Sequence, residues 1–291
     1  MICMRSTSNG HHQVLGMNYR NRELVAAHNP KRAIAQANDK IASKQLLFQQ
    51  AIQVPALIAA IRVPSDVERV YPALVRSEKG FVVKPARSAQ GRGVIPFSRA
   101  LAERVLPHQG EPLTRRAFRY YISRILHGEF SFGRPMDAAL VEQRIRPDES
   151  WIMSDLPGPP DLRIIVLHGR PVMAMARLPT LISAGRANLH RGAVGLGIDL
   201  ESGTSTHAIW REQPVTHHPD SGLALRGLRV AGFEECLNLT VRCAQALPLG
   251  YMGVDIMRDK NDGPYVIELN ARPGLAIQLA NQRGLGAVCH G

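Results

Sequence analysis

Two acidic residues lie inside apolar runs near the end of the chain, and an asparagine follows them. Asp255 lies in a Val-Asp-Ile run, Glu268 comes thirteen residues later in Val-Ile-Glu-Leu, and Asn270 is two residues further on. On a strand, Glu268 and Asn270 project to the same face. Charged side chains rarely enter such runs unless they are paired or bind metal, and carboxylate oxygens suit Mg2+. Two interpretations are open here: a metal site, or buried acids in salt bridges.

A second candidate is a lysine that precedes a turn rich in glycine. Lys84 ends the run Phe-Val-Val-Lys, and residues 88–93 read Ser-Ala-Gln-Gly-Arg-Gly. A lysine among valines needs an anionic partner, and backbone N–H groups of such a turn can cradle phosphate. The turn lacks the Walker A pattern, and the next segment is predicted as a strand, which excludes a dinucleotide-binding loop. The alternative is an ordinary hairpin whose lysine reaches solvent.

Four other places carry polar groups that could face the same ligand. They are Lys40 at a helix start, Glu142 at a strand end, the pair Asp161 and Arg163 on one strand face, and the polar loop 188–192. A strand end between two lobes is a common place for a ligand. Each group also has a structural interpretation, namely a solvated lysine, a surface glutamate, a simple salt bridge and a solvated loop.

Composition limits the class of protein. The 291 residues are 45% hydrophobic, so a core can form, and no apolar run is long enough to insert into a membrane. The N-terminus lacks the apolar stretch of a signal peptide, which makes a cytoplasmic location the default expectation. The net charge of +12 fits anionic ligands, but the absence of a basic run and of abundant aromatic residues argues against nucleic acid.

The predicted elements give an α+β chain with an N-terminal arm and two lobes. Residues 1–38 are expected to be a partly disordered arm, 39–138 a first lobe with the lysines and the glycine-bearing lid, and 139–291 a second lobe with antiparallel strands. Helices are expected at 39–50, 64–76, 114–127 and 233–247, and strands at 56–63, 81–85, 94–97, 139–145, 162–167, 172–178, 193–200, 251–257 and 265–269. The proline-rich loop 146–160 is expected to be mobile or inserted.

Taken together and in this order, these segments resemble the ATP-grasp superfamily over residues 36–282. The last segments are most similar to ribosomal-protein glutamate ligases (RimK-like) and to the alpha-L-glutamate ligase-related, sugar-transferase-associated group. The resemblance implies the ATP-grasp fold, in which two α+β lobes with antiparallel sheets clasp ATP. Because only about 36 residues precede the matching segments, the separate N-terminal domain of the ribosomal-protein ligases is expected to be missing. The longer loop at 146–160 is expected to shape a different substrate pocket.

The resemblance also implies roles for individual residues. Arg163 and Arg272 would be catalytic, because they would neutralise charge on an acyl phosphate and on the departing phosphate. His190 and Arg191 would lie near the substrate. Asp255, Glu268 and Asn270 would hold one or two Mg2+ ions, for which Mn2+ could substitute. The residues implied to bind ATP are Lys40, Lys84, Gln90, Gly91, Gly93, Glu142, Gln143, Ile145, Asp161, Arg186 and Asn188.

The implied activity is ATP-dependent ligation of a carboxylate to an amine, with an acyl-phosphate intermediate and release of ADP and phosphate. The partners would be a small-molecule amino acid, for which the resemblance suggests glutamate, and a carboxylate-bearing peptide, protein or metabolite. A homo-oligomer is compatible with the sequence. Two alternatives stay open: a phosphotransferase acting on a hydroxyl, and a non-catalytic nucleotide-binding partner.

Overall fold

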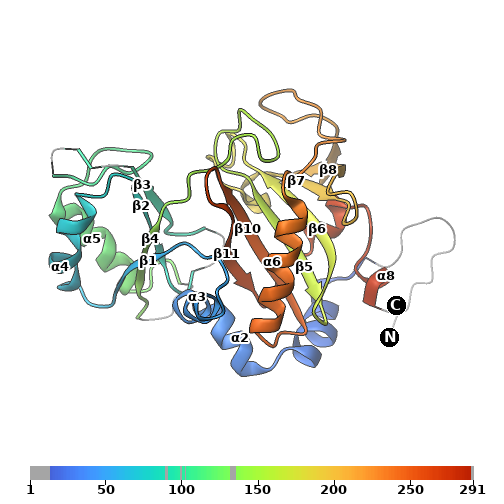
Figure 1. Cartoon of the computed structure of the whole chain (residues 1–291), viewed down its shortest axis with the longest axis horizontal. Coiled ribbons are helices and arrows are strands. Elements are labelled where there is room, and N and C mark those ends of the chain that lie inside the picture. The colour runs from blue at the N-terminus through green and yellow to red at the C-terminus, as the bar shows by residue number, and fades with distance from the viewer. Residues whose placement is uncertain (1–13, 89–90, 99, 102, 132–135, 290–291) are drawn as a thin grey trace. The chain divides into compact units, whose positions relative to one another are not determined.

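The computed structural model describes residues 14–88, 91–98, 100–101, 103–131 and 136–289 (Figure 1). Two compact units divide the chain. Unit 1 comprises residues 1–30, 149–255 and 270–291, and unit 2 comprises residues 31–148 and 256–269. Unit 2 takes in the predicted first lobe together with the tip of the last hairpin, whereas the predicted arm is divided between the units.

The elements of unit 2 are a small sheet and four helices. Its helices are α2 (Lys31–Asn38), α3 (Lys40–Gln49), α4 (Asp66–Leu74) and α5 (Arg115–Leu126), and its strands are β1 (Leu57–Ile61), β2 (Phe81–Pro85), β3 (Ile95–Phe97) and β4 (Ala139–Gln143). The strands are antiparallel in the order β1-β4-β2-β3. All four strands and three of these helices were expected from the sequence; α2 lies in the predicted arm.

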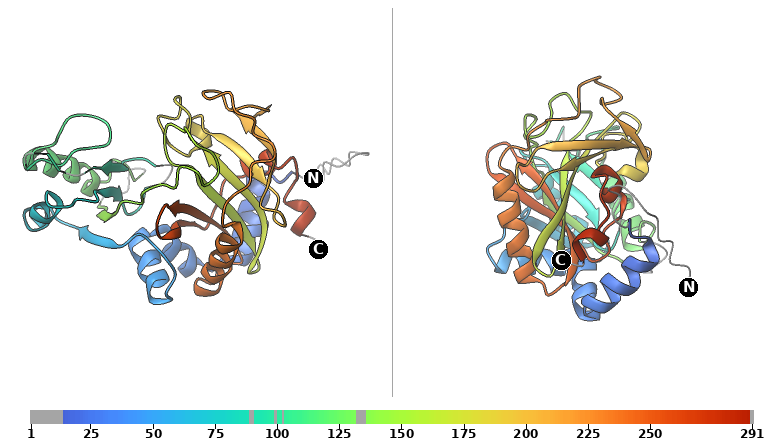
Figure 2. Two further views of the ribbon diagram at one scale, coloured as in Figure 1. Left: turned by 45° about the horizontal axis from the view of Figure 1, so that its top comes forward. Right: turned by 90° about the vertical axis from the view of Figure 1, so that its right-hand side faces the viewer.

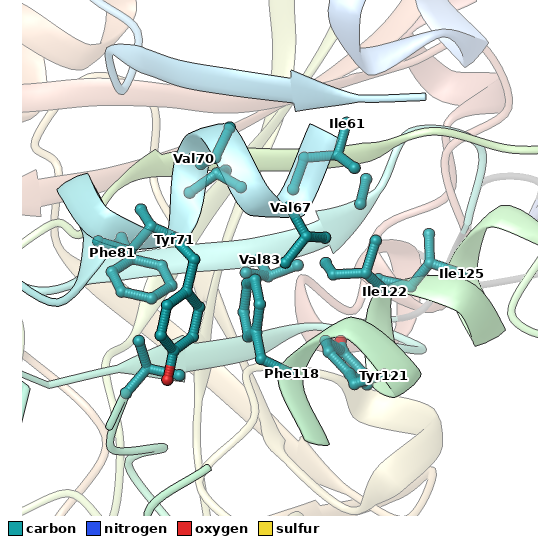
Figure 3. Close-up of a cluster of buried hydrophobic side chains, with 14 of the residues drawn as sticks. Ile61, Val67, Val70, Tyr71, Phe81, Val83, Phe118, Tyr121, Ile122 and Ile125 are labelled. Atoms are coloured by element: carbon teal, nitrogen blue, oxygen red, sulfur yellow. The ribbon is translucent and has the colours of Figure 1, made fainter. Parts of the chain in front are cut away.

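One face of this sheet is apolar and packs against α4 and α5 (Figure 3). Phe81 and Val83 of β2 point to this face, where Tyr71 and Phe118 meet them from the two helices. The rings of Phe81 and Phe97 stack with centroids 4.7 Å apart. Side chains alternate along a strand, so the residues between them must point to the other face.

Helix α3 packs on that other face. Asp39 caps the helix, because its Oδ1 accepts hydrogen bonds from the backbone N–H groups of Ile41 (3.0 Å) and Ala42 (3.1 Å), as N-cap residues do. Ile41 then packs against Leu140 of β4. Lys40 and Lys44 of α3 therefore lie on the same side of the sheet as Lys84.

Unit 1 is built on a larger antiparallel sheet. Its elements are α1 (Met17–Tyr19), a π-helical turn η1 (Arg20–Ala26), β5 (Asp161–Leu167), β6 (Arg170–Leu178), a short 3-10 helix η2 (Leu189–Arg191), β7 (Val194–Ile198), β8 (Ser205–Trp210), β9 (Gln213–Val215), α6 (Phe233–Ala246), α7 (Ala276–Ala280) and α8 (Gly286–Cys289). The strand order is β11-β10-β5-β6-β7-β8-β9, where β10 is Tyr251–Asp259 and β11 is Gly263–Asn270. The division between the units falls inside β10 and β11.

Helices cover both faces of the unit 1 strands. Helix α6 packs against β5 and β6, and α7 packs against β6, β7 and β8. Figure 2 shows them on opposite sides of the strands. The prediction of an α+β chain with antiparallel sheets is confirmed. Strands β8 and β9 were not predicted. Among the described residues, no helix is long and apolar enough to cross a membrane.

The segment before residue 31 belongs to unit 1 rather than forming a separate arm where it is described. The Asn29 amide donates to the carbonyls of Tyr251 (2.7 Å) and Ala271 (3.2 Å), and its Oδ1 accepts from the Tyr251 N–H (2.9 Å). Arg20 Nη1 donates to the Pro273 carbonyl at 3.1 Å. These contacts join residues more than 200 positions apart, which a local sequence pattern does not reveal.

The loop at 146–160, expected to be mobile or inserted, is anchored to unit 1 through its buried tryptophan. Trp151 is 1% exposed. Its Nε1 donates to the Ala231 carbonyl at 2.9 Å, and its own carbonyl accepts from the Ala231 N–H at 3.1 Å. A bulky aromatic side chain with a satisfied indole N–H is a strong anchor, so the loop is held at this point.

We predict that Asn29→Ala lowers the free energy of unfolding of unit 1 by about 2–4 kcal/mol, because buried backbone groups of Tyr251 and Ala271 lose their partner. Both tryptophans, Trp151 and Trp210, lie in unit 1, so urea unfolding followed by tryptophan fluorescence reports this unit. The exposed Asn21→Ala change is the matched control. Equal unfolding curves for the two variants would show that Asn29 does not anchor the segment.

Candidate functional site

Unit 2 buries two lysines around one glutamate. We call Lys44, Lys84 and Glu142 the lysine cluster. Lys84 Nζ lies 2.6 Å from Glu142 Oε2, and Lys44 Nζ lies 2.9 Å from Oε1 while donating to Oε2 at 3.0 Å. All three side chains are buried, and Glu142 is only 2% exposed. Among the described residues, Oε1 has no aligned hydrogen-bond donor, so this oxygen could accept one from a ligand.

Strand alternation brings the cluster together. In the β2–β4 pair, Val82 lies opposite Glu142 and Lys84 lies opposite Leu140. Lys84 and Glu142 are therefore diagonal neighbours on one face. Lys44 comes from α3, one helical turn after Lys40, and residues four apart share a helix face.

The charges of the lysine cluster act strongly on one another because water is excluded. Burial opposes ionisation of Glu142, but the ammonium groups of Lys84 and Lys44 outweigh burial and lower its pKa. Burial, with the like charge of Lys84, lowers the pKa of Lys44 to about 7, although Glu142 partly offsets both effects. With both lysines protonated, the cluster has one positive charge more than its carboxylate can balance.

Lys40, predicted to contact ATP, pairs with Glu268, predicted to bind metal. Lys40 Nζ lies 3.1 Å from Glu268 Oε1 and also donates to the Ser88 carbonyl. The backbone N–H of Lys40 donates to the Ala86 carbonyl at 3.2 Å. The first residue of α3 is thereby tied to the segment that follows β2 and to a carboxylate of unit 2.

The residues of the predicted glycine-bearing lid and the predicted ATP-binding residues Gln143 and Ile145 contact different parts of unit 2. Gly91 and Gly93 have positive φ angles of 66° and 64°, and the Gly93 carbonyl accepts from the Tyr121 hydroxyl at 2.6 Å. Gln143 pairs with Ala56 through its backbone N–H (2.9 Å) and its Oε1 (3.3 Å). Ile145 is buried. Gln90 lies outside the described residues.

Unit 1 contains a second buried set of charges, which we call the arginine–aspartate cluster: Asp161, Arg163, Arg177 and Asp255. Arg163 binds Asp255 through two hydrogen bonds, Nε to Oδ1 at 2.7 Å and Nη2 to Oδ2 at 2.6 Å. Arg177 binds Asp161 through Nε at 2.5 Å and through Nη2, which also reaches Asp255 Oδ2 at 3.0 Å. The cluster alternates acid and base and carries no net charge when every member is ionised.

The two aspartates of this cluster have opposite pKa shifts. Burial raises the pKa of Asp161 to about 6, against the attraction of Arg177. Burial also opposes ionisation of Asp255, but Arg163 and Arg177 together outweigh it, and the pKa of Asp255 is lowered. The number of guanidinium partners therefore decides which of the two carboxylates is the harder to protonate.

The predicted metal ligands are divided between the units, with Asp255 and Asn270 in unit 1 and Glu268 in unit 2. Their oxygens fit Mg2+ by donor type. The Asp255 carboxylate, however, accepts four hydrogen bonds, from Arg163 twice, from Arg177, and from the Asn270 amide at 3.1 Å. Three of these reach Oδ2 and one reaches Oδ1, so a cation bound at Oδ2 would replace one of these donors.

The loop that carries Arg186, Asn188, His190 and Arg191 is pinned at both ends. Asn188 Oδ1 accepts from the His190 N–H at 2.9 Å and begins η2, and Thr180 Oγ1 donates to the Gly192 carbonyl at 2.8 Å. His190 and Arg191 are exposed, whereas Arg186 and Asn188 are half-buried.

A backbone contact joins this loop to the one that Trp151 anchors. A Cβ added to Gly158 would lie 2.1 Å from the Gly185 carbonyl oxygen, so the close approach requires glycine. The two loops therefore form one supported surface in unit 1, beside the segment of Arg186 and Asn188. The other predicted catalytic residue, Arg272, is exposed just after β11.

Two residues of these clusters, Lys44 and Arg177, were missed from the sequence. Lys44 is one of only six lysines and lies one helical turn after Lys40, which is a detectable signal. Arg177 lies opposite Asp161 in the β5–β6 register, which shifts between Ile165 and Val166. Counting outward from the predicted hairpin turn at 168–171 would therefore not have found the pair.

We predict that Arg177→Met lowers the free energy of unfolding of unit 1 by about 3–5 kcal/mol, because Asp161 and Asp255 lose a shared buried counter-ion. The exposed Arg170→Met change on the same strand removes the same charge without touching either aspartate. Urea unfolding followed by tryptophan fluorescence compares them. A loss under 1 kcal/mol for Arg177→Met would show that the cluster does not stabilise unit 1.

Known proteins resemble the chain along most of its length. It is 29% identical over 261 residues to a probable alpha-L-glutamate ligase of Xanthomonas oryzae pv. oryzae, covering 90% of this chain and 63% of that protein. It is 30% identical over 247 residues to a probable alpha-L-glutamate ligase of Xylella fastidiosa, covering 85% of this chain and 60% of that protein. The chain thus spans less than two thirds of the length of these curated relatives.

Solved structures give weaker likenesses. The ATP-grasp ligase PsnB, complexed with a phosphomimetic variant of a minimal precursor, Mg and ADP, superimposes with a TM-score of 0.49 at 16% identity, covering 90% of this chain and 60% of that one. D-cycloserine synthetase DcsG gives a TM-score of 0.48 at 14% identity, covering 86% of this chain and 70% of that one.

The family assignment rests on the sequence profile. It agrees with the resemblance drawn from the turn after Lys84 and from the hairpin of Asp255, Glu268 and Asn270. The profile of the sugar-transfer associated ATP-grasp proteins matches residues 19–290. This range includes both charged clusters, the glycine turn and the last hairpin. The chain therefore belongs to the sugar-transfer associated ATP-grasp family.

Proposed function

We propose that the chain is an ATP-dependent carboxylate–amine ligase that forms an amide bond through an acyl phosphate and releases ADP and phosphate. The observation that carries the proposal is the lysine cluster of unit 2. Its excess positive charge is buried, and such a charge is costly without an anion. A nucleotide phosphate would supply that anion.

Unit 2 would contribute most of the nucleotide contacts. Lys84 and Lys40 would bind phosphate oxygens, with Lys40 exchanging its contact with Glu268 for the ligand. Glu142 Oε1, which lacks an aligned donor among described residues, would accept a hydrogen bond from the adenine amino group or the ribose. Gln143 and Ile145 would flank the base, while Gln90, Gly91 and Gly93 would cover the phosphates with backbone N–H groups.

The chemistry itself requires positioning and charge neutralisation more than a side-chain nucleophile. A substrate carboxylate oxygen attacks the γ-phosphorus, and the bond to the β–γ bridging oxygen breaks, which gives ADP and an acyl phosphate. The amine nitrogen then attacks the acyl carbon, the carbon–oxygen bond to phosphate breaks, and the amine loses a proton. Arg163 and Arg272 would stabilise the negative charge that develops on the transferred group.

Asp255, Asn270 and Glu268 would hold Mg2+, which when bound neutralises phosphate charge. Arg163 would also orient this metal ligand, since its Nε and Nη2 donate to the two oxygens of Asp255. Asp161 would act on the nucleotide site through Arg177 rather than by direct contact. Arg186 and Asn188 would approach the triphosphate, and His190 and Arg191 would face the substrate.

Glutamate is the amine substrate that we propose first. The curated relatives are named probable alpha-L-glutamate ligases, and an excess of basic over acidic residues, +12 in net charge, favours acidic substrates. The acceptor would be a carboxylate-bearing peptide, protein or metabolite. It would bind unit 1 at the two loops that meet at Gly158 and Gly185.

We predict that continued turnover to ADP requires ATP, Mg2+, an amine and a carboxylate together. Release should be screened over pairs of amino acids and peptides, with mass spectrometry of the products. A mass gain equal to the amine minus water supports the ligase. A gain of one phosphate on a hydroxyl substrate would replace the ligase with a phosphotransferase, and release of AMP would contradict both.

We predict that Asp255→Asn and Glu268→Gln each lower the rate of ADP formation roughly 100-fold or more, because each removes charge that would bind Mg2+ beside the reacting phosphate. The exposed Glu201→Gln change removes a carboxylate from unit 1 without touching either cluster and should keep the full rate. Unfolding curves separate lost activity from lost structure. Full ATP turnover by the Asp255→Asn, Glu268→Gln double variant would disprove the metal assignment.

A further inference from the structure

Lys44 is the member of the lysine cluster that no sequence motif pointed to. It comes from α3, whereas Lys84 and Glu142 come from neighbouring strands. Its ammonium group contacts both oxygens of Glu142, at 2.9 and 3.0 Å. A single carboxylate is therefore shared by two buried ammonium groups.

This arrangement cannot be balanced by the cluster itself. Two lysines and one glutamate leave a net charge of +1 when all three are ionised, and burial makes such an excess expensive. The free chain can relieve it in only two ways: a buried anion can bind, or one lysine can lose its proton. Lys84 Nζ lies 2.6 Å from Glu142 Oε2, whereas the contacts of Lys44 are longer. Lys44 is therefore the lysine that can lose its proton more easily.

Among the described residues, the carboxylate that pairs with Lys44 is Glu142. The charged groups on α3, on its cap and on the elements packed against it are Glu142 of β4, Lys84 of β2, Asp39, Lys40, and Lys31 and Arg32 of α2. Asp39 caps the helix and lies 3.7 Å from Arg87, Lys40 is paired with Glu268, and Lys31 and Arg32 are exposed. Lys44 thus shares Glu142 with the like charge of Lys84.

We propose that Lys44 is a proton-coupled positioning residue, which takes up one proton when a nucleotide phosphate binds beside Lys84. This inference rests on the proposed function, since it needs a nucleotide. Once protonated, Lys44 would hold Glu142 through an ion pair, and the ammonium group of Lys84 would contact the phosphate. The lysine cluster would then become neutral as a whole with the ligand in place.

The direction of the pKa shift agrees with this role. Burial, then the charge of Lys84, lowers the pKa of Lys44 to about 7 in the free chain, from about 10.4 for a lysine in water. The unfolded chain therefore binds this proton between those two values while the folded chain does not, so this group makes folding more favourable as pH rises through that window. A bound anion favours the protonated form of Lys44, so Lys44 takes up a proton when the anion binds.

Calorimetric titration with MgADP at pH 8, in two buffers of different ionisation enthalpy, measures this proton directly. Phosphate groups titrate near pH 6 and are ionised at pH 8, so they neither release nor take up a proton there. We expect an uptake between about half a proton and one proton per nucleotide for the wild-type chain. Lys44→Met should abolish that uptake and weaken MgADP binding roughly tenfold at pH 6.5, with a smaller effect at pH 9.

Two further variants separate charge from structure. Lys44→Arg keeps a permanent charge, so it should bind MgADP without proton uptake. The exposed Lys79→Met change removes a lysine from the same unit and should keep the wild-type uptake. A mere packing role for Lys44 would alter affinity without removing the proton, and the arginine variant remains informative if the methionine variant does not fold.

The outcomes distinguish this inference from the function on which it rests. Binding of MgADP by the wild-type chain without uptake at pH 8 would overturn the inference and leave the nucleotide site standing. Persistent uptake in Lys44→Arg would do the same, because another group would then be the acceptor. Failure of the wild-type chain to bind any adenine nucleotide would overturn the proposed function and this inference together.

Discussion

Charge that is buried away from water must be balanced, and this requirement governs both units of the chain. In unit 1, two aspartates and two arginines alternate, so every buried charge has an opposite neighbour. In unit 2, two lysines share Glu142, so the balance is incomplete. A neutral buried cluster favours one rigid arrangement, whereas a cluster with a net charge is stabilised when a counter-ion binds. The two clusters are thus built from similar parts but differ in their net charge.

The same strand geometry builds both clusters. On β2, Phe81 and Val83 enter the apolar core while Lys84 points to the other face. On β5, Asp161 and Arg163 are two residues apart and share one face, where Arg177 crosses from β6. A register shift of one residue would exchange the apolar and charged faces and bury every charge without a partner. The charged clusters therefore help to specify the strand pairing that positions them.

The sequence was sufficient to predict most elements because periodicity and caps are local. The α3 helix and the strand that carries Lys84 followed from neighbouring residues. Which residues partner one another was harder, since this depends on tertiary contacts. Asp255 illustrates the limit: an acid in an apolar run predicts a partner of opposite charge, but not whether that partner is a metal ion or Arg163 and Arg177. The anchoring of Asn29 to Tyr251 has no local signal at all.

The choice of glutamate, rather than a neutral amide, at position 142 follows from the same charge balance. A neutral amide there would leave two buried ammonium groups with no counter-ion, which is costly enough that one or both lysines would lose a proton or leave the interior. Two glutamates around two lysines would be neutral and would have no reason to bind an anion. One glutamate between two lysines keeps Lys84 ordered in the free chain and still leaves the cluster short of one negative charge. The incomplete pairing is the feature from which we propose that this buried site binds phosphate.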